Sequence, residues 1–283
     1  MKKHPEIQKQ HRLSQVYLKK FGFQIDGEWM VSIIELGNRK IQNVKVSEFT
    51  AEENIFDLPF TNFDHKRHFE TLSGKLENDY NRLVNNLEYQ KALTEKDKDL
   101  LNNFIANILC RTTHFRSYIK GLIDDVDTRI FFLKEIMMFK NDGGDIEYLL
   151  NTLKSETHLN LVIGPLMNHM VFVLSHFKKV ILKSPKGYGW LTTDNPVYID
   201  NNEKYEWILP IEAELYFPIS REYCVFLFHK DSKINSNPLR YLKLDKVNQI
   251  DYELFDKLIF NITRNLDKYL IFSENQNLTH KNC

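Results

Sequence analysis

An arginine interrupts the apolar face of a predicted helix, and its fixed charge makes it the most informative residue in the chain. Arg111 lies seven positions after Phe104 and four before Phe115, so at 100° per residue all three share one face. A guanidinium cannot be deprotonated in a protein, and burying it without a partner is costly. Arg111 therefore needs a carboxylate, backbone carbonyls or a bound anion. It is either a clamp between helix and sheet or a ligand-binding group.

Carboxylates that could pair with Arg111 lie on the preceding predicted helix, in the segment KLENDY. Ideal helical angles place Asp79 near the apolar stripe of that helix and Glu77 on its flank, so geometry alone favours Asp79 for burial. A solvated face is the alternative for both residues. Arg116 lies at the edge of the stripe that contains Arg111, where it suits a second clamp or a phosphate contact.

The stretch GWLTTDNPVYID places Asp194, Asn195 and Pro196 at the end of an apolar extended run. Asx side chains cap the local backbone, and a proline disfavours the helical conformation in the residue before it, so the first interpretation is a turn. A carboxylate held at the end of a rigid strand is also well placed for binding or catalysis. The sequence does not separate these two roles.

Metal-ligand patterns are absent from the sequence. His65 and His68 could face one way on a helical turn, but no third ligand is adjacent. The three cysteines, Cys110, Cys224 and Cys283, are widely spaced and indicate neither a zinc site nor a disulfide framework. Phosphate-binding glycine motifs are missing as well. The sequence leaves open whether a divalent ion takes part in the function.

Helical periodicity dominates the middle of the chain. Apolar residues recur at intervals of three and four from Phe69 to about Leu87. Thr94 is a suitable N-cap for a long helix from Glu95 to about Ile119, with acidic residues in its first turn. Gly143-Gly144 breaks the next helical stretch, and a further helix is expected from Asp145 to about Glu156.

Alternating apolar residues near both ends of the chain predict strands. The runs WMVSIIEL and KIQNVKVSEF flank Gly37-Asn38 and indicate a β-hairpin. After Lys178 the candidate strands are KVILKS, GWLTTD, AELYFPI, YCVFLFH and KYLIFSE, with a helix from about Lys246 to Leu266 before the last of them. We therefore expect an α+β fold with an N-terminal β-hairpin, a central helical bundle and a C-terminal, mainly antiparallel sheet with a late helix. Residues 1–283 form a single domain in this interpretation, and two intimate lobes, 1–177 mostly helical and 178–283 mostly strands, are the alternative.

Composition narrows the range of functions. Of 283 residues, 42% are apolar and 13% aromatic, which is ample for a packed core. Acidic and basic residues number 38 each, so a polybasic protein that coats nucleic acid or membrane is not indicated, although a local basic groove is compatible with this balance. The N-terminus lacks the apolar core of a signal peptide. The segment LNLVIGPLMNHMVFVLSHF carries polar side chains and a proline, which predicts a buried helix or two rather than a membrane span. A cytoplasmic protein without a membrane partner is expected.

The segment HRLSQVYLKKF, which begins at His11, resembles the opening motif of a widespread bacterial family, domain-of-unknown-function family 4238. That motif runs His-Tyr-Val-Pro-Gln, then Leu, a basic pair and Phe. An acidic helix around Glu77, CRTTHFR, WLTTDNPVYI, LYFPIS and Asn261 before KYLIFS follow in the family's order, so the resemblance spans most of the chain. Ser14 replaces the usual proline, and Thr113 replaces a proline often found at that place.

The resemblance implies that six polar residues from four distant segments belong to one pattern. They are His11, Glu77 and Asp194 as catalytic groups, and Arg111, Arg116 and Asn195 as ligand-binding groups. In a shared site the histidine would act as general acid or base, the carboxylates would orient water or a divalent ion, and the guanidinium groups would offset phosphate charge.

Two classes of function fit this set. One is a hydrolase of phosphodiesters or nucleotides, such as a nuclease-like bacterial toxin or defence effector. The other is a non-enzymatic module that binds a nucleotide, a peptide or a nucleic acid through the same residues. The sequence does not decide whether the protein is an enzyme, and it gives no oligomeric state.

Overall fold

Helices in the first half of the chain pack against a sheet that comes mainly from the second half. The computed structural model describes residues 6–38, 40–123, 125, 155–200 and 209–273. The helices are α1 (Gln15–Leu18), α2 (Phe63–Lys66), α3 (His68–Tyr89), α4 (Glu95–Arg111), α5 (Thr113–Ile123), α8 (Glu156–Ser175) and α9 (Tyr252–Thr263). The strands are β1 (Lys9–His11), β2 (Phe23–Ile25), β3 (Glu28–Glu35), β4 (Ile41–Lys45), β5 (Ala51–Glu53), β6 (Phe177–Lys183), β7 (Thr192–Thr193), β8 (Tyr198–Asp200), β9 (Glu214–Pro218), β10 (Tyr223–His229), β11 (Val247–Gln249) and β12 (Tyr269–Phe272). The α+β class predicted from the sequence is confirmed.

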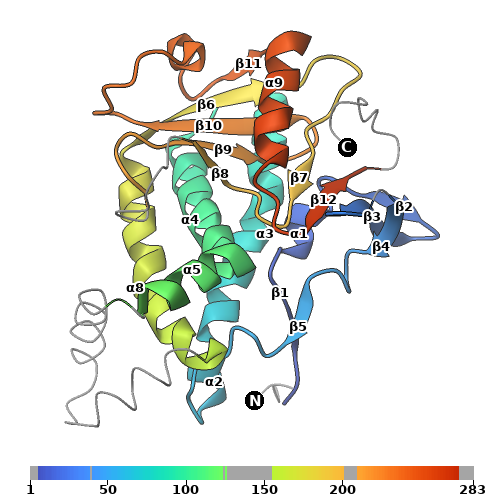
Figure 1. Cartoon of the computed structure of the whole chain (residues 1–283), viewed down its shortest axis with the longest axis vertical. Helices are drawn as coiled ribbons and strands as arrows, with labels where there is room; N and C mark the ends of the chain where they lie inside the picture. Colours follow the sequence, from blue (N-terminus) through green and yellow to red (C-terminus); the bar gives the residue numbers. More distant parts are fainter. Residues whose placement is uncertain (1–5, 39, 124, 126–154, 201–208, 274–283) are drawn as a thin grey trace.

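The largest C-terminal sheet has the strand order β11-β6-β10-β9-β8, and α3, α4 and α8 lie below it while α9 crosses it (Figure 1). Its pairs are antiparallel except for β11, which runs parallel to β6. A second sheet joins β2, β3, β12 and β7, with β4 also paired to β3. The predicted hairpin is confirmed by the antiparallel β3–β4 pair, in which Ser32 lies opposite Asn43.

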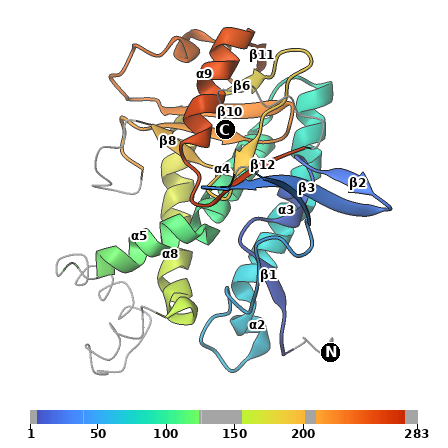
Figure 2. The same cartoon turned by 45° about the vertical axis from the view of Figure 1, so that its right-hand side comes forward.

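The C-terminal strand β12 pairs with β3 of the N-terminal hairpin, and Figure 2 shows the two strands side by side from a second direction. Ile271 lies opposite Ile33 in this pair, and both are buried. The strand β7 then continues the same sheet through its pairing with β12. Segments from both ends of the sequence thus form one hydrogen-bonded layer.

The late helix is shorter than the sequence predicts. A helix from about Lys246 to Leu266 was expected, but Val247–Gln249 instead form the parallel strand β11. The helix α9 begins only after Asp251, whose carboxylate accepts a hydrogen bond from the backbone N–H of Leu254 at 2.9 Å. This N-cap fixes the start of the helix and leaves the preceding residues free to extend the sheet.

The prediction of one long helix from Glu95 to about Ile119 is wrong, because the helix is interrupted at Thr112. Thr112 has the extended torsion angles φ −64° and ψ 146°, and its hydroxyl accepts a hydrogen bond from the N–H of Phe115 at 3.3 Å. A side chain that bonds to the nearby backbone competes with the helix in this way. Arg111 therefore ends α4, whereas Arg116 belongs to α5. The expected break at Gly143-Gly144 and the expected helix from Asp145 to about Glu156 fall almost entirely outside the described residues.

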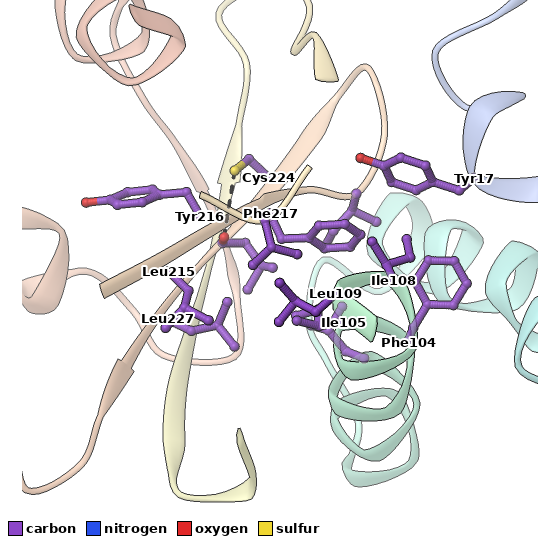
Figure 3. Close-up of a cluster of buried hydrophobic side chains, with 14 of the residues drawn as sticks. Tyr17, Phe104, Ile105, Ile108, Leu109, Leu215, Tyr216, Phe217, Cys224 and Leu227 are labelled. Atoms are coloured by element: carbon purple, nitrogen blue, oxygen red, sulfur yellow. Dashed lines mark hydrogen bonds between the residues drawn. The ribbon is translucent and has the colours of Figure 1, made fainter. Parts of the chain in front are cut away.

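The helix α4 supplies the apolar contacts that hold the helices to the sheet. Figure 3 shows Phe104, Ile105, Ile108 and Leu109 facing β9 and β10, and Phe217 is among the buried residues opposite them. Each such side chain contributes about 1.5–3 kcal/mol when it is fully buried. The start of α4 is fixed separately, by a capping box between Thr94 and Asp97.

A single helix, α8, forms from the apolar segment for which one or two buried helices were expected. It is the one helix in the described part of the chain that is long and apolar enough to cross a membrane by length and composition alone. Its Asn160 donates hydrogen bonds to the carbonyl oxygens of Ile55 and Asp57, at 3.1 and 2.8 Å. These bonds tie α8 to a loop beside the N-terminal strand β1.

The short helix α1 is anchored to the sheets through Tyr17. The buried hydroxyl of Tyr17 donates to the carbonyl oxygen of Pro218 at 3.0 Å and shares a hydrogen bond of 2.6 Å with the Thr192 hydroxyl. Its ring stacks on Phe217 with centroids 5.4 Å apart. An isolated four-residue helix is unstable in water, so α1 depends on this anchor.

We predict that Tyr17→Phe lowers the free energy of unfolding by about 1–2 kcal/mol, because it leaves buried partners of the hydroxyl without a hydrogen bond. Tyr241→Phe is the matched control, since Tyr241 is 77% exposed and should change stability by less than about 0.5 kcal/mol. Urea unfolding of the two variants checks this. Equal losses in both would contradict the anchoring role of Tyr17.

Candidate functional site

A polar pocket of ≈ 340 Å³ lies between α1 and α3. One wall is the exposed side of α3, and the other is the end of β1 together with α1. The lining residues are His11, Gln15, Val16, Lys19, Glu70, Glu77, Asn78, Asn81 and Arg111. Its volume is in the range of small-molecule binding sites, but its lining is mostly polar and charged.

Arg111 is buried at one end of this pocket, as the helical pattern predicts, with only 1% of its surface exposed. Its guanidinium forms an ion pair of 2.8 Å with Glu70, and its Nε donates to the carbonyl oxygen of His11 at 2.9 Å. The guanidinium carbon also lies 4.1 Å from the ring centroid of Phe56, a cation–π contact. Within the described part of the chain, Nη1 of Arg111 has no hydrogen-bond partner. Nη1 is itself buried, so the charge is held in place by groups of the protein.

Glu77, rather than Asp79, faces the pocket. Burial raises the pKa of Glu77, while the positive charge of Arg111 and the hydroxyl of Ser14 act in the opposite direction. Asp79 points to solvent with 60% of its side chain exposed and lies 3.7 Å from Arg82. The expectation from helical angles that Asp79 is the buried carboxylate is therefore wrong. The short helix α1 covers the flank of α3 that carries Glu77. The periodicity of α3 alone does not predict this contact with another segment.

His11 ends β1 and contributes its ring to the pocket. Burial lowers the pKa of His11, the hydrogen bond to the Ser47 carbonyl raises it, and the nearby charge of Arg111 lowers it further. The His11 Nε2 lies 3.0 Å from that carbonyl oxygen. The Gln15 amide nitrogen lies 3.3 Å from the same Nε2. The bond to the Ser47 carbonyl requires the tautomer with its proton on Nε2, which leaves Nδ1 as the basic nitrogen.

Arg116 is equally buried but does not line the pocket. It donates from Nε to the Glu156 carboxylate at 2.7 Å, and its guanidinium carbon lies 5.4 Å from the centroid of Phe56. Burial lowers the pKa of Arg116, and the Glu156 carboxylate opposes this effect. The pair joins α5 to the first turn of α8. Arg116 thus contacts the same aromatic ring as Arg111 without reaching the pocket lining.

Asp194 and Asn195 lie outside the pocket as well. The Asp194 carboxylate accepts hydrogen bonds from the backbone N–H groups of Asp267 and Lys268, at 3.0 and 2.8 Å. Burial raises the pKa of Asp194, and these donors act against it. Asn195 lines a separate apolar crevice of ≈ 20 Å³ next to His114. Asp194 therefore caps the connection between α9 and β12, which is the turn-type role considered for it, and the six residues do not gather in one pocket.

A buried polar network supports the residues beneath the pocket. Gln10 precedes His11, donates to Asp57 at 2.8 Å and accepts a hydrogen bond from the N–H of Phe56. Asp57 in turn pairs with Arg67 at 2.9 Å, and both side chains are only 3% exposed. The network fixes β1 against the loop that carries Phe56. It therefore sets the distance between the two groups that contact Arg111.

Several lining residues carry little signal in the sequence. Glu70 could have been found, because it lies seven residues before Glu77 and so on the same face of α3. Gln15, Lys19 and the two asparagines are ordinary surface residues by type. Among the described residues, no three His, Cys, Asp or Glu side chains are grouped so that they could hold a metal ion.

The fold and pocket define an α+β protein with a buried arginine, a histidine and two carboxylates at one polar site. The chain matches the family described as "Protein of unknown function (DUF4238)" over residues 9–273. It therefore belongs to this family, as its motifs indicate. Comparisons with curated proteins and with solved structures gave no significant match.

We predict that Arg111→Ala lowers the free energy of unfolding by about 3–5 kcal/mol, because removal of one partner strands the others of a buried ion pair. Arg82→Ala removes the exposed pair with Asp79 on α3 and should cost less than about 0.5 kcal/mol. Chemical unfolding followed by circular dichroism measures both. A similar, small effect of the two substitutions would show that Arg111 does not hold the site together.

Proposed function

We propose that the pocket is the active site of a hydrolase that cleaves a phosphate ester, in a nucleotide or a phosphodiester. One observation carries this proposal: the buried guanidinium of Arg111 lines the pocket together with a histidine and two glutamates. A fixed cation that needs no reorganisation is well suited to stabilise charge on a phosphoryl group.

Burial shifts the pKa values of His11 and Glu77 in the directions that the proposed reaction requires. It lowers the pKa of His11 and raises that of Glu77, so it favours the neutral form of both groups. The neutral form of a histidine is a base, whereas the neutral form of a glutamate is an acid. Glu70 differs from Glu77 because it forms an ion pair with Arg111 at 2.8 Å. Two carboxylates in different environments support different roles.

The proposed reaction uses these groups as acid and base. His11 Nδ1 removes a proton from a water molecule, and the water oxygen bonds to phosphorus. The bond from phosphorus to the leaving oxygen breaks, and the Glu77 carboxylic acid gives its proton to that oxygen. Arg111 offsets the charge on the phosphoryl oxygens. Glu77 lies seven residues along α3 from Glu70, about 10 Å at 1.5 Å per residue, which leaves room for the phosphate between the acid and the Arg111 end.

We further propose a cytoplasmic location, supported by the buried free thiols of Cys110 and Cys224. A phosphoester hydrolase of this kind would suit a bacterial toxin or defence effector that acts on nucleotides or nucleic acid. Asp194, Asn195 and Arg116 take no direct part in this scheme. Asp194 and Arg116 support it through the turn and the helix contact that they stabilise.

A non-enzymatic binding module is the second candidate. It is favoured by the remaining polar side chains that line the pocket, Gln15, Lys19, Asn78 and Asn81, which can hydrogen-bond a ligand but supply no acid–base group near neutral pH. In that case the pocket binds a nucleotide, a peptide or a nucleic-acid end without turnover. Product formation during prolonged incubation with nucleotides and oligonucleotides, with and without divalent ions, separates the two candidates.

The proposal predicts a bell-shaped dependence of kcat/KM on pH with its maximum at mildly acidic pH. Activity should rise as the pH passes the pKa of His11, which lies below its ordinary 6.5, because the base is then unprotonated. It should fall as the pH passes the pKa of Glu77, which lies above its ordinary 4.5, because the acid is then lost.

Glu77→Gln should remove the alkaline limb of this profile and lower kcat/KM by about 10²-fold or more. Asp79→Asn is the matched control, since Asp79 lies two residues away on the solvent side of α3. Its profile should equal that of the unmodified protein. An unchanged pH profile in Glu77→Gln would contradict the acid role of Glu77.

A further inference from the structure

The two walls of the pocket run alongside each other. Charge interactions relate His11 to Glu70 and Lys20 to Glu88, and the hydroxyl of Ser14 acts on Glu77 between them. The segment from His11 to Lys20, which contains α1, therefore follows α3 in the same direction. Along α3 the lining extends from Glu70 to Asn81, about 16 Å at 1.5 Å per residue.

The two ends of the pocket differ in chemistry. Arg111, Glu70 and His11 form the end that suits a phosphoryl group. The opposite end presents the amides of Asn78 and Asn81 on α3. An amide has a donor and an acceptor side by side, which is the arrangement that matches N6 and N7 of adenine in a bidentate hydrogen bond.

The lining does not suit a nucleic-acid chain. Its charges balance, with Glu70 and Glu77 against Arg111 and Lys19, whereas a site for a polyanion carries an excess of basic residues. Proteins that bind single strands also stack successive bases on aromatic side chains. Among the described residues that line this pocket, the His11 ring at the phosphate end is the only aromatic group.

From these features we infer that the substrate is a single adenine nucleotide, with its phosphate at Arg111 and its base read by Asn78 and Asn81. This inference rests on the proposed function and narrows it from phosphate esters in general to one class. The pocket volume of ≈ 340 Å³ suits one small molecule rather than a length of polymer. Lys19 lies on the α1 side of the pocket, where it can contact the outer part of the ligand.

Equilibrium binding tests the inference without any need for turnover. AMP, GMP, CMP, UMP and a six-nucleotide oligoadenylate are titrated into the full chain by calorimetry. AMP should bind most tightly of the four mononucleotides, and the oligoadenylate should bind no more tightly than AMP. Asn81→Ala should lower the preference for AMP over UMP by at least about 5-fold, because a bidentate base contact is lost.

Asn85→Ala is the control, one turn further along α3 and outside the pocket lining, and it should keep the preference. Both asparagines are exposed, so neither change removes a core contact. Asn78→Ala serves as a second variant if Asn81→Ala does not fold. Tighter binding of the oligoadenylate, equal binding of the four nucleotides, no binding, or an unchanged preference in both pocket variants would each overturn the inference.

The result of this binding experiment can be distinguished from the result of a test for hydrolase activity. Selective AMP binding without hydrolysis would keep the assignment of the pocket to adenine nucleotides and remove the hydrolase. Hydrolysis of phosphodiesters without a preference for adenine mononucleotides would keep the hydrolase and remove the inference.

Discussion

The charge of Arg111 is the constraint on which the rest of the site depends. A guanidinium cannot shed its proton to avoid the cost of burial, so the chain must bring partners to it. They come from three places: the carboxylate of Glu70 on α3, the carbonyl of His11 at the end of β1, and the ring of Phe56 in a loop. Each partner belongs to a different segment. The pocket forms where these segments come together around Arg111.

A second layer of buried polar residues keeps those partners in place. Gln10 links β1 to the Phe56 loop, Asp57 links that loop to Arg67 at the start of α3, and Asn160 links it to α8. Buried charges and amides of this kind are expensive to leave unsatisfied, so they specify one arrangement rather than many. This layer also explains why polar residues remote from the pocket matter to its shape.

Patterns within one segment allowed much of the fold to be predicted. The hairpin, the helix α3 and the strand β10 follow from periodicity, and the inward position of Arg111 follows from one helical face. Some failures arose where distant segments decide the outcome, as in the pairing of β11 with β6, and one has a local cause. The break at Thr112 depends on a local side-chain bond that competes with a good helical pattern.

The candidate site was predicted only in part, for the same reason. His11, Glu77 and Arg111 meet, because the family motif links segments that periodicity treats separately. Asp194 does not join them, since a carboxylate that caps a turn has the same sequence appearance as one in an active site. Glu70 was not among the predicted site residues, because only its ion pair with Arg111 distinguishes it from other acidic residues on α3.

The pairing of β12 with β3 has a consequence for biosynthesis. One sheet contains strands from near both ends of the polypeptide. The Tyr17 hydroxyl, which anchors α1, forms its hydrogen bonds only after Thr192 and Pro218 have been synthesised. While the ribosome is still translating the middle of the message, β3 is paired only with β2 and β4, and α1 lacks the partners of Tyr17. The fold around the pocket is therefore completed late, once translation has passed Phe272 and that strand has left the exit tunnel.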